Sequence, residues 1–154
     1  MNRLLLTILN GVFALTLTVP PALGQAEDPQ AKAKANRAFD VAKRFFRDGM
    51  FATAIERFDT LAKAHPGSAH HAEAVLLEGQ ARFQLGQFET VASGLAAGLQ
   101  SAGPWTDRYL FWIGEAQFAL GRFDQAAASY GQLIEKHPGS ARALTAALGQ
   151  AQSL

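Results

Sequence analysis

The sequence predicts an all-α fold, a right-handed α-solenoid of about three helical hairpins followed by a C-terminal helix. Two repeated phrases carry this prediction. A decapeptide beginning at Gly79 returns in similar form at Gly114, and its first residues return at Gly149, so the starts are 35 residues apart. A second phrase, His65-Pro-Gly-Ser-Ala69, returns as His137-Pro-Gly-Ser-Ala141. Self-similarity at this period is typical of stacked helical arrays, which bury a continuous core between neighbouring units.

Residues 1–24 are predicted to be a signal peptide, and residues 25–34 a short segment before the repeat domain. Arg3 supplies a positive charge, a mostly apolar run extends from Leu4 to Val19, and Ala22-Leu23-Gly24 offers small residues before a cleavage point. The run is shorter than the roughly 20 residues of a spanning helix, which favours cleavage over the alternative of a retained anchor. We therefore expect a periplasmic protein without stable membrane insertion after signal cleavage.

The composition excludes several classes of function. The chain has no cysteine, which excludes disulfides, thiolate metal sites and lipid attachment through a cysteine. It has 14 basic and 13 acidic side chains, and removing Arg3 with the signal leaves equal numbers. This balance argues against a nucleic-acid-binding protein, whose affinity would depend on an excess of Lys and Arg.

Each repeat is expected to be a hairpin of a helix A and a helix B, joined at Gly49, Gly86 or Gly121. The glycine ends helix A where the backbone turns left-handed. An aromatic residue follows two positions later, a small residue or valine five positions later, and a large residue nine positions later. The small residue lets the two helices approach closely, and the large one fills the space toward the next unit. Pro66 and Pro138 cannot continue helix B and end their units.

The repeat domain is predicted over residues 35–154. Its parts are repeats at about 35–71, 72–106 and 107–141 and a C-terminal helix at 142–154. The second repeat is the least regular, because Gly94 and Gly98 lie inside its helix B and each costs up to about 1 kcal/mol relative to alanine. We expect this helix to be the least stable element.

The pattern resembles the tetratricopeptide repeat (TPR) family over residues 35–140. The matching positions include the turn glycines, the aromatic residues that follow them, and large helix B residues such as Phe58, Leu95 and Tyr130. A narrower stretch from Tyr109 to Ala141 looks like the periplasmic Tol–Pal coordinator proteins and the outer-membrane assembly lipoprotein. The resemblance implies a scaffold or adaptor that binds a peptide or protein segment in a concave groove, in cell-envelope assembly or division. It implies no enzymatic activity and no cofactor.

In the TPR family the groove is lined by the second, fifth, ninth and twelfth positions of helix A, with the thirteenth nearby. Carried onto this chain, the resemblance implies an aromatic floor with mixed charges. The alternative is that the apolar members of this set pack inside the stack. The predicted lining residues are Asn36, Phe39, Lys43, Phe46, Arg47, Glu73, Leu76, Gln80, Phe83, Arg108, Phe111, Glu115 and Phe118. Family members that clamp acidic chaperone tails need Lys, Arg and Asn at fifth and ninth positions, and here only Lys43 would serve.

The alternatives to the scaffold are a metal or catalytic site and a self-associating structural subunit. His65, His70, His71 and Glu73 could form a surface zinc site, but a solvated turn is favoured because adjacent helical histidines point about 100° apart. No catalytic motif is present, so we predict no catalytic, cofactor-binding or metal-binding residues. The alternative function is a structural, self-associating subunit of a secretion or polysaccharide-export assembly. A homo-oligomer could form because the C-terminal helix lacks its own helix B.

Overall fold

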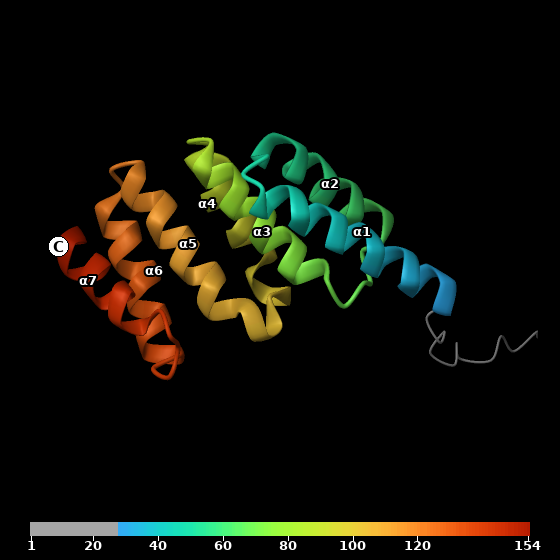
Figure 1. Cartoon of the computed structure of the whole chain (residues 1–154). Helices are drawn as coiled ribbons and strands as arrows, with labels where there is room; N and C mark the ends of the chain where they lie inside the picture. The colour runs from blue at the N-terminus through green and yellow to red at the C-terminus, as the bar shows by residue number, and fades with distance from the viewer. Residues whose placement is uncertain (1–27) are drawn as a thin grey trace, which may run out of the picture.

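The structure, a computed structural model, describes residues 28–154. The predicted signal peptide and the start of the predicted segment 25–34 lie outside these residues. The described part is all helical, which confirms the predicted all-α solenoid (Figure 1). Its helices are α1 (Pro29–Arg47), α2 (Phe51–Ala64), α3 (His71–Gln84), α4 (Phe88–Gly98), α5 (Thr106–Ala119), α6 (Phe123–Lys136) and α7 (Ala143–Ser153), with short 3₁₀ turns η1 (Leu99–Ser101) and η2 (Gly103–Trp105) between α4 and α5.

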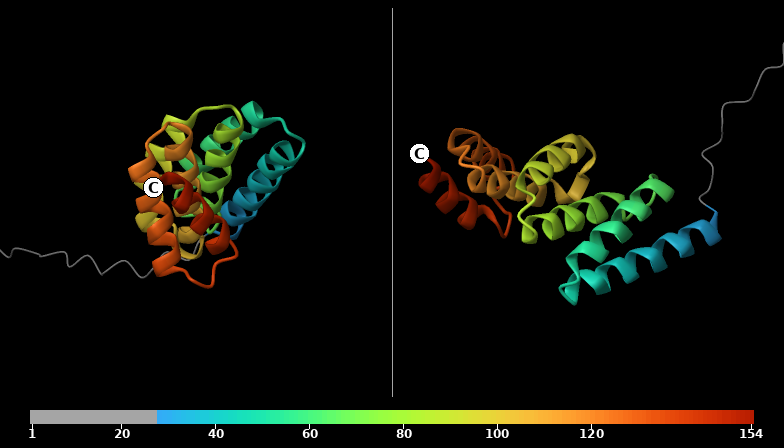
Figure 2. Two further views of the ribbon diagram at one scale, coloured as in Figure 1. Left: turned by 90° about the vertical axis from the view of Figure 1, so that its left-hand side faces the viewer. Right: turned by 90° about the horizontal axis from the view of Figure 1, so that it is seen from above.

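The helices form hairpins that follow one another along the stack, α1–α2, α3–α4 and α5–α6, with α7 packed against α6 (Figures 1 and 2). The helices A, namely α1, α3, α5 and α7, also contact one another in succession, whereas contacts between successive helices B are weaker. Because the helices A lie nearer to one another, they form the inner side of the stack. We term the solvent-facing side of these four helices the helix-A surface. No helix among residues 28–154 is long and apolar enough to cross a bilayer.

The glycine turns take the predicted left-handed conformation. Gly49, Gly86 and Gly121 have φ angles of 75°, 73° and 71°. In each turn the residue after the glycine donates its backbone N–H to a carbonyl five residues earlier, as Met50 does to Phe45 at 2.9 Å. These bonds satisfy carbonyls at the end of helix A that would otherwise lack partners. The turn therefore sets the antiparallel course of helix B.

A pair of phenylalanines braces every turn. The last phenylalanine of helix A meets the first residue of helix B edge-to-face, an arrangement favoured by the charge distribution of aromatic rings. The ring centroids lie 4.9 to 5.7 Å apart, and the rings are inclined by 63° to 68°. The pairs are Phe46–Phe51, Phe83–Phe88 and Phe118–Phe123.

The glycines that recur inside helix A make room for a large residue of helix B. A Cβ atom on Gly114 would lie 2.6 Å from the Tyr130 ring, and one on Gly149 would lie 2.8 Å from the same ring. Tyr130 therefore occupies the space between α5 and α7. A Cβ on Gly79 would lie 3.1 Å from Leu95 in the second repeat. The repeated glycine of the sequence is thus a requirement of close helix packing.

Capping and packing contacts accompany two helix boundaries, the start of α1 and the end of α4. Helix α1 begins at Pro29, because Asp28 accepts a hydrogen bond from the Gln30 N–H at 3.0 Å and proline suits the first helical position. The described part of the predicted segment 25–34 is therefore the start of α1. In the second repeat, Gly98 ends α4 where a Cβ would lie 3.2 Å from the Tyr109 ring. That glycine has a packing role in addition to its cost in helix stability.

Candidate interaction surface

The predicted lining residues divide by depth. Phe39, Leu76 and Phe111, at the fifth position of each helix A, are only 3%, 1% and 5% exposed. These three side chains form the layer beneath the helix-A surface. The first and third are supported by helix B, because Phe39 lies 6.2 Å from Phe58 and Phe111 lies 6.2 Å from Tyr130, both ring pairs inclined by 56°.

A flat side chain packs against the buried layer in front of each of the last three helices A. These three side chains, His70, Trp105 and Arg142, immediately precede α3, α5 and α7, and we term them the cover residues. The His70 ring stacks on Phe39 with centroids 4.3 Å apart and 10° between planes. Trp105 packs against the core cluster that contains Leu76. The Arg142 guanidinium lies 4.6 Å from the Phe111 ring.

At the N-terminal end of the surface the polar groups pair with one another. The His70 Nε2 atom lies 3.0 Å from Asn36 Oδ1, and Lys43 Nζ lies 3.1 Å from Glu73 Oε1. Lys43 also lies 5.0 Å from the centre of the Phe39 ring. Four predicted residues, Asn36, Phe39, Lys43 and Glu73, are therefore brought together between α1 and α3. Their charges are balanced locally.

At the C-terminal end the acidic group is held by a tyrosine. The Tyr130 hydroxyl donates to Glu115 Oε1 at 2.7 Å. Burial, followed by the hydrogen bond and the negative charge of Glu115, raises the pKa of Tyr130 well above its ordinary value. The basic groups Arg108 and Arg142 form no ion pair among residues 28–154; each lies over an aromatic ring, Arg108 over Trp105 at 4.6 Å.

In the middle of the surface, the second and third repeats contact each other through aromatic side chains. Phe83 meets Trp112 of the next repeat edge-to-face, with ring centroids 5.0 Å apart. Below the surface, the Tyr109 hydroxyl donates to the Ala72 carbonyl at 2.8 Å and so links α5 to α3. Burial, with a smaller effect of the Glu78 charge, raises the pKa of Tyr109 to about 12.

The exposed members of the predicted set lie on helices A. Asn36, Arg47 and Arg108 are exposed, and Lys43, Phe46, Glu73, Gln80, Phe83, Glu115 and Phe118 are partly exposed. Phe46, Phe83 and Phe118 each give one part of the ring to the turn pair and leave part of it accessible. The surface thus offers one partly exposed phenylalanine at the same position of each repeat.

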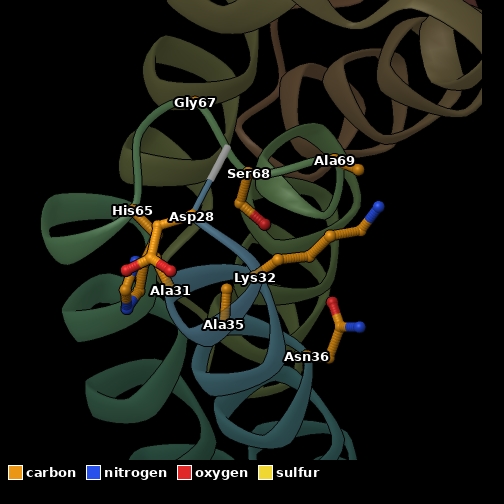
Figure 3. A pocket seen from close by; sticks show the side chains of 9 residues that line it. All are labelled: Asp28, Ala31, Lys32, Ala35, Asn36, His65, Gly67, Ser68 and Ala69. Carbon is orange, nitrogen blue, oxygen red and sulfur yellow. The ribbon is translucent and has the colours of Figure 1, made fainter. Parts of the chain in front are cut away.

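A small cavity of about 150 Å³ lies beside the start of α1 (Figure 3). Lys32 and Asn36 of α1 line it together with His65 and Ser68 of the loop between α2 and α3. Of the predicted lining residues it includes Asn36. Among residues 28–154 no three His, Asp or Glu side chains gather as metal ligands would.

Sequence reasoning missed the cover residues and Trp112. His70 and Trp105 stand nine residues before the recurring Gly79 and Gly114, whereas Arg142 stands seven residues before Gly149. What the three share is their place immediately before a helix A, which depends on where each helix begins and which the glycine spacing does not mark.

The stacked hairpins define an α-solenoid of helix pairs, and the comparisons with known proteins identify the kind. Family models described as tetratricopeptide repeat match residues 39–104 and 108–140. The chain belongs to the TPR family.

Two solved structures show the same fold. One is the first TPR of Spaghetti (RPAP3) bound to the HSP90 peptide SRMEEVD, with a TM-score of 0.67 and 20% identity over 79% of this chain and 94% of that chain. The other is the NMR structure of the first TPR domain of human RPAP3, with a TM-score of 0.62 and 18% identity over 77% and 94%. No curated protein matches the sequence.

Proposed function

We propose that this chain is an exported scaffold or adaptor that binds a peptide or protein segment on its helix-A surface. The observation that carries the proposal is the row of partly exposed phenylalanines, Phe46, Phe83 and Phe118, at one position of successive repeats. Aromatic side chains that are partly accessible and rigidly held are favourable anchors for apolar groups of a partner. The similar structure of Spaghetti, which holds a peptide, supports this use of the fold.

Binding on this surface would follow the geometry of the repeat. Apolar side chains of the bound segment would contact the accessible parts of the phenylalanine rings, while the charged groups around them would set its register. The turn pairs hold those rings in place before binding, so little side-chain entropy is lost when the segment docks. The surface acts by recognition, without a catalytic group.

The compartment and pathway belong to the same proposal. The predicted signal peptide supports export to the periplasm, and the resemblance of residues 109–141 to the Tol–Pal coordinator proteins supports a role in envelope assembly or division. The partner would then be a segment of a periplasmic or envelope protein. The fifth- and ninth-position residues of this chain, with Lys43 the one suitable cation, argue against the chaperone tail as its ligand.

Site-specific photo-crosslinking in intact cells tests the surface. A photo-reactive amino acid at Gln84 or Ala119, exposed positions next to Phe83 and Phe118, should crosslink to the partner. The same amino acid at Ser93 or Gln125, exposed on helices B, is the matched control and should give little product. The double variant Gln84→Glu and Ala119→Glu should abolish capture while the helical content stays unchanged. Equal crosslinking from both sets of positions would exclude the helix-A surface as the binding site.

A specific observation also favours the self-associating alternative. Leu144, Leu148 and Leu154 of the C-terminal region are 85%, 60% and 93% exposed. By the spacing of the recurring glycines Ala146 occupies the register of Leu76 and is buried, so the exposed leucines lie outside the packed face of α7. Light scattering of the full chain distinguishes the two functions. Dimers or larger species that dissociate in a Leu144→Glu, Leu148→Glu variant would support self-association, and a monomer at high concentration would exclude it.

A further inference from the structure

The first and third repeats cover the same buried phenylalanine position in chemically different ways. His70 covers Phe39, and Arg142 covers Phe111. In the first case the ring nitrogen of the cover residue already has a partner, Asn36 Oδ1 at 3.0 Å. In the third case the cover residue is a permanent cation whose guanidinium has no hydrogen-bond partner among residues 28–154. The two ends of the surface therefore differ in what they still offer to a ligand.

Arg142 is held in a fixed position. Its guanidinium lies 4.6 Å from the Phe111 ring and 5.8 Å from the Trp112 ring, so aromatic faces support the cation. Its backbone N–H donates to Ser140 Oγ at 3.1 Å. Asp107 accepts a hydrogen bond from that same serine hydroxyl at 2.5 Å and forms no ion pair with Arg142. A stacked guanidinium keeps its N–H edge available for a planar acceptor such as a carboxylate.

The charges of the surrounding surface point to the same ligand chemistry. The two predicted acidic lining residues are engaged, Glu73 by Lys43 and Glu115 by the Tyr130 hydroxyl. The basic residues Arg47, Arg108 and Arg142 form no ion pair within residues 28–154. Asp40 and Asp107 of the helices A also form no ion pair within residues 28–154, but the unpaired basic side chains outnumber the unpaired acidic ones, so the helix-A surface carries an excess of positive charge. Such a surface attracts acidic segments and disfavours basic ones.

We propose that Arg142 is the receptor for an acidic side chain of the bound segment, an Asp or Glu that precedes or follows an apolar anchor. The carboxylate pairs with the free edge of the guanidinium, and the neighbouring apolar side chain contacts Trp112 and Phe83, which lie edge-to-face beside it. This inference rests on the proposed function, because it names the chemistry of the segment that the helix-A surface holds.

Peptide selection tests the proposal directly. A phage-displayed library of random short peptides is selected on the purified full chain, and the same selection is run on Arg142→Gln, Arg142→Lys and Arg122→Gln. Arg122 pairs with Glu89 at 2.7 Å at the turn end of the hairpins, so its variant is the matched loss of an arginine charge elsewhere. The wild type and Arg122→Gln should enrich an acidic residue beside an apolar one. Arg142→Gln should keep the apolar preference and lose the acidic one.

Synthetic peptides from the selection then give the size of the effect. An enriched peptide with an amidated C-terminus should bind Arg142→Gln at least about tenfold more weakly than the wild type, as expected when a charge-assisted hydrogen bond is lost. Arg142→Lys should be intermediate, because lysine keeps the charge without the flat, bidentate donor edge. Loss of binding on amidation alone would assign the carboxylate to the peptide terminus and overturn the proposal.

The possible failures are separable. Selected peptides without an acidic preference, or an acidic preference unchanged in Arg142→Gln, would overturn the role of Arg142 and leave the scaffold proposal intact. Failure to select any peptide whose binding depends on Gln84 and Ala119 would overturn the proposed function and this inference together. A role of Arg142 in packing alone would change the melting temperature of Arg142→Gln without changing the peptide consensus.

Discussion

Residues 36–70 and residues 108–142 are related by an offset of 72 positions, and the comparison separates what the repeat fixes from what it leaves free. The apolar contacts are the same in both regions: Phe39 meets Phe58 with the distance and inclination that Phe111 and Tyr130 share. The polar groups above them differ: His70 bonds to Asn36 and Lys43 pairs with Glu73 of the next helix A, whereas Arg142 forms no ion pair within residues 28–154. Packing between helices thus constrains the buried positions, whereas the surface positions are free to specify a partner.

The largest expected effect tests the shared core. Phe58→Ala and Tyr130→Ala should each destabilise the protein by about 3 to 5 kcal/mol, the usual cost of deleting a buried aromatic side chain. Because both rings lie at the same distance from their partners, the two losses should be similar in denaturant unfolding. A loss in one repeat several times larger than in the other would show that the two cores are not energetically equivalent.

The contact between α5 and α3 through the Tyr109 hydroxyl is expected to weaken at alkaline pH. Tyr109 of α5 bonds to α3, and its pKa of about 12 lies above the ordinary value of 10.0. The folded state retains a proton that the unfolded chain loses, so this contribution is complete below pH 10 and is lost as pH rises toward 12. Its full size is about 3 kcal/mol, from about two pKa units at 1.36 kcal/mol per unit. Tyr109→Phe should therefore show a flatter fall in stability than the wild type over that range.

The third repeat should tolerate an added methyl group between helix A and helix B less well than the first repeat does. Gly114→Ala places a Cβ 2.6 Å from the buried Tyr130 ring and should cost about 1 to 3 kcal/mol, more than alanine gains in helix propensity. Ala42 stands at the equivalent position, fully buried, and Ala42→Gly should cost about 1 kcal/mol. Thermal unfolding of both variants measures the difference. A more stable Gly114→Ala protein would mean that the ring moves aside freely.

The smallest effect concerns the paired charges of the first repeat. Lys43→Met removes the partly exposed pair with Glu73 and should change stability by less than about 1 kcal/mol. Tyr130→Phe, which frees Glu115 in the third repeat, should cost about 1.5 kcal/mol because a hydrogen bond to a charged group is lost. Reversal of this order in chemical denaturation would show that the first region depends more on its polar groups than the third.

The period of the repeat could be predicted from the sequence because it rests on local rules. Gly49, Gly86 and Gly121 were recognisable as turns, and their positive φ angles confirm it. The large helix B residues Phe58, Leu95 and Tyr130 were recognisable as fillers by their spacing, and all three are buried. Such features depend on the side-chain spacing within one helix or one turn, which the sequence displays directly.

The depth of the predicted surface residues could not be obtained in the same way. Helical spacing places Phe39, Leu76 and Phe111 on one side of their helices, but burial depends on what lies above them. The covering side chains come from about 30 positions further along the chain, as His70 does for Phe39 and Arg142 for Phe111. The start of α1 at Pro29 similarly depends on a cap at Asp28 that the repeat pattern does not include.

The sequence by itself determined that this protein is a stack of helical hairpins, because the residues that form turns and fill the space between helices recur at a readable interval. The tertiary structure decided which side chains remain available to a partner. Availability depends on contacts between helices, both within one repeat and between successive repeats. These contacts bury the fifth-position rings, pair Lys43 with Glu73 and Glu115 with Tyr130, and leave the guanidinium of Arg142 stacked and unpaired.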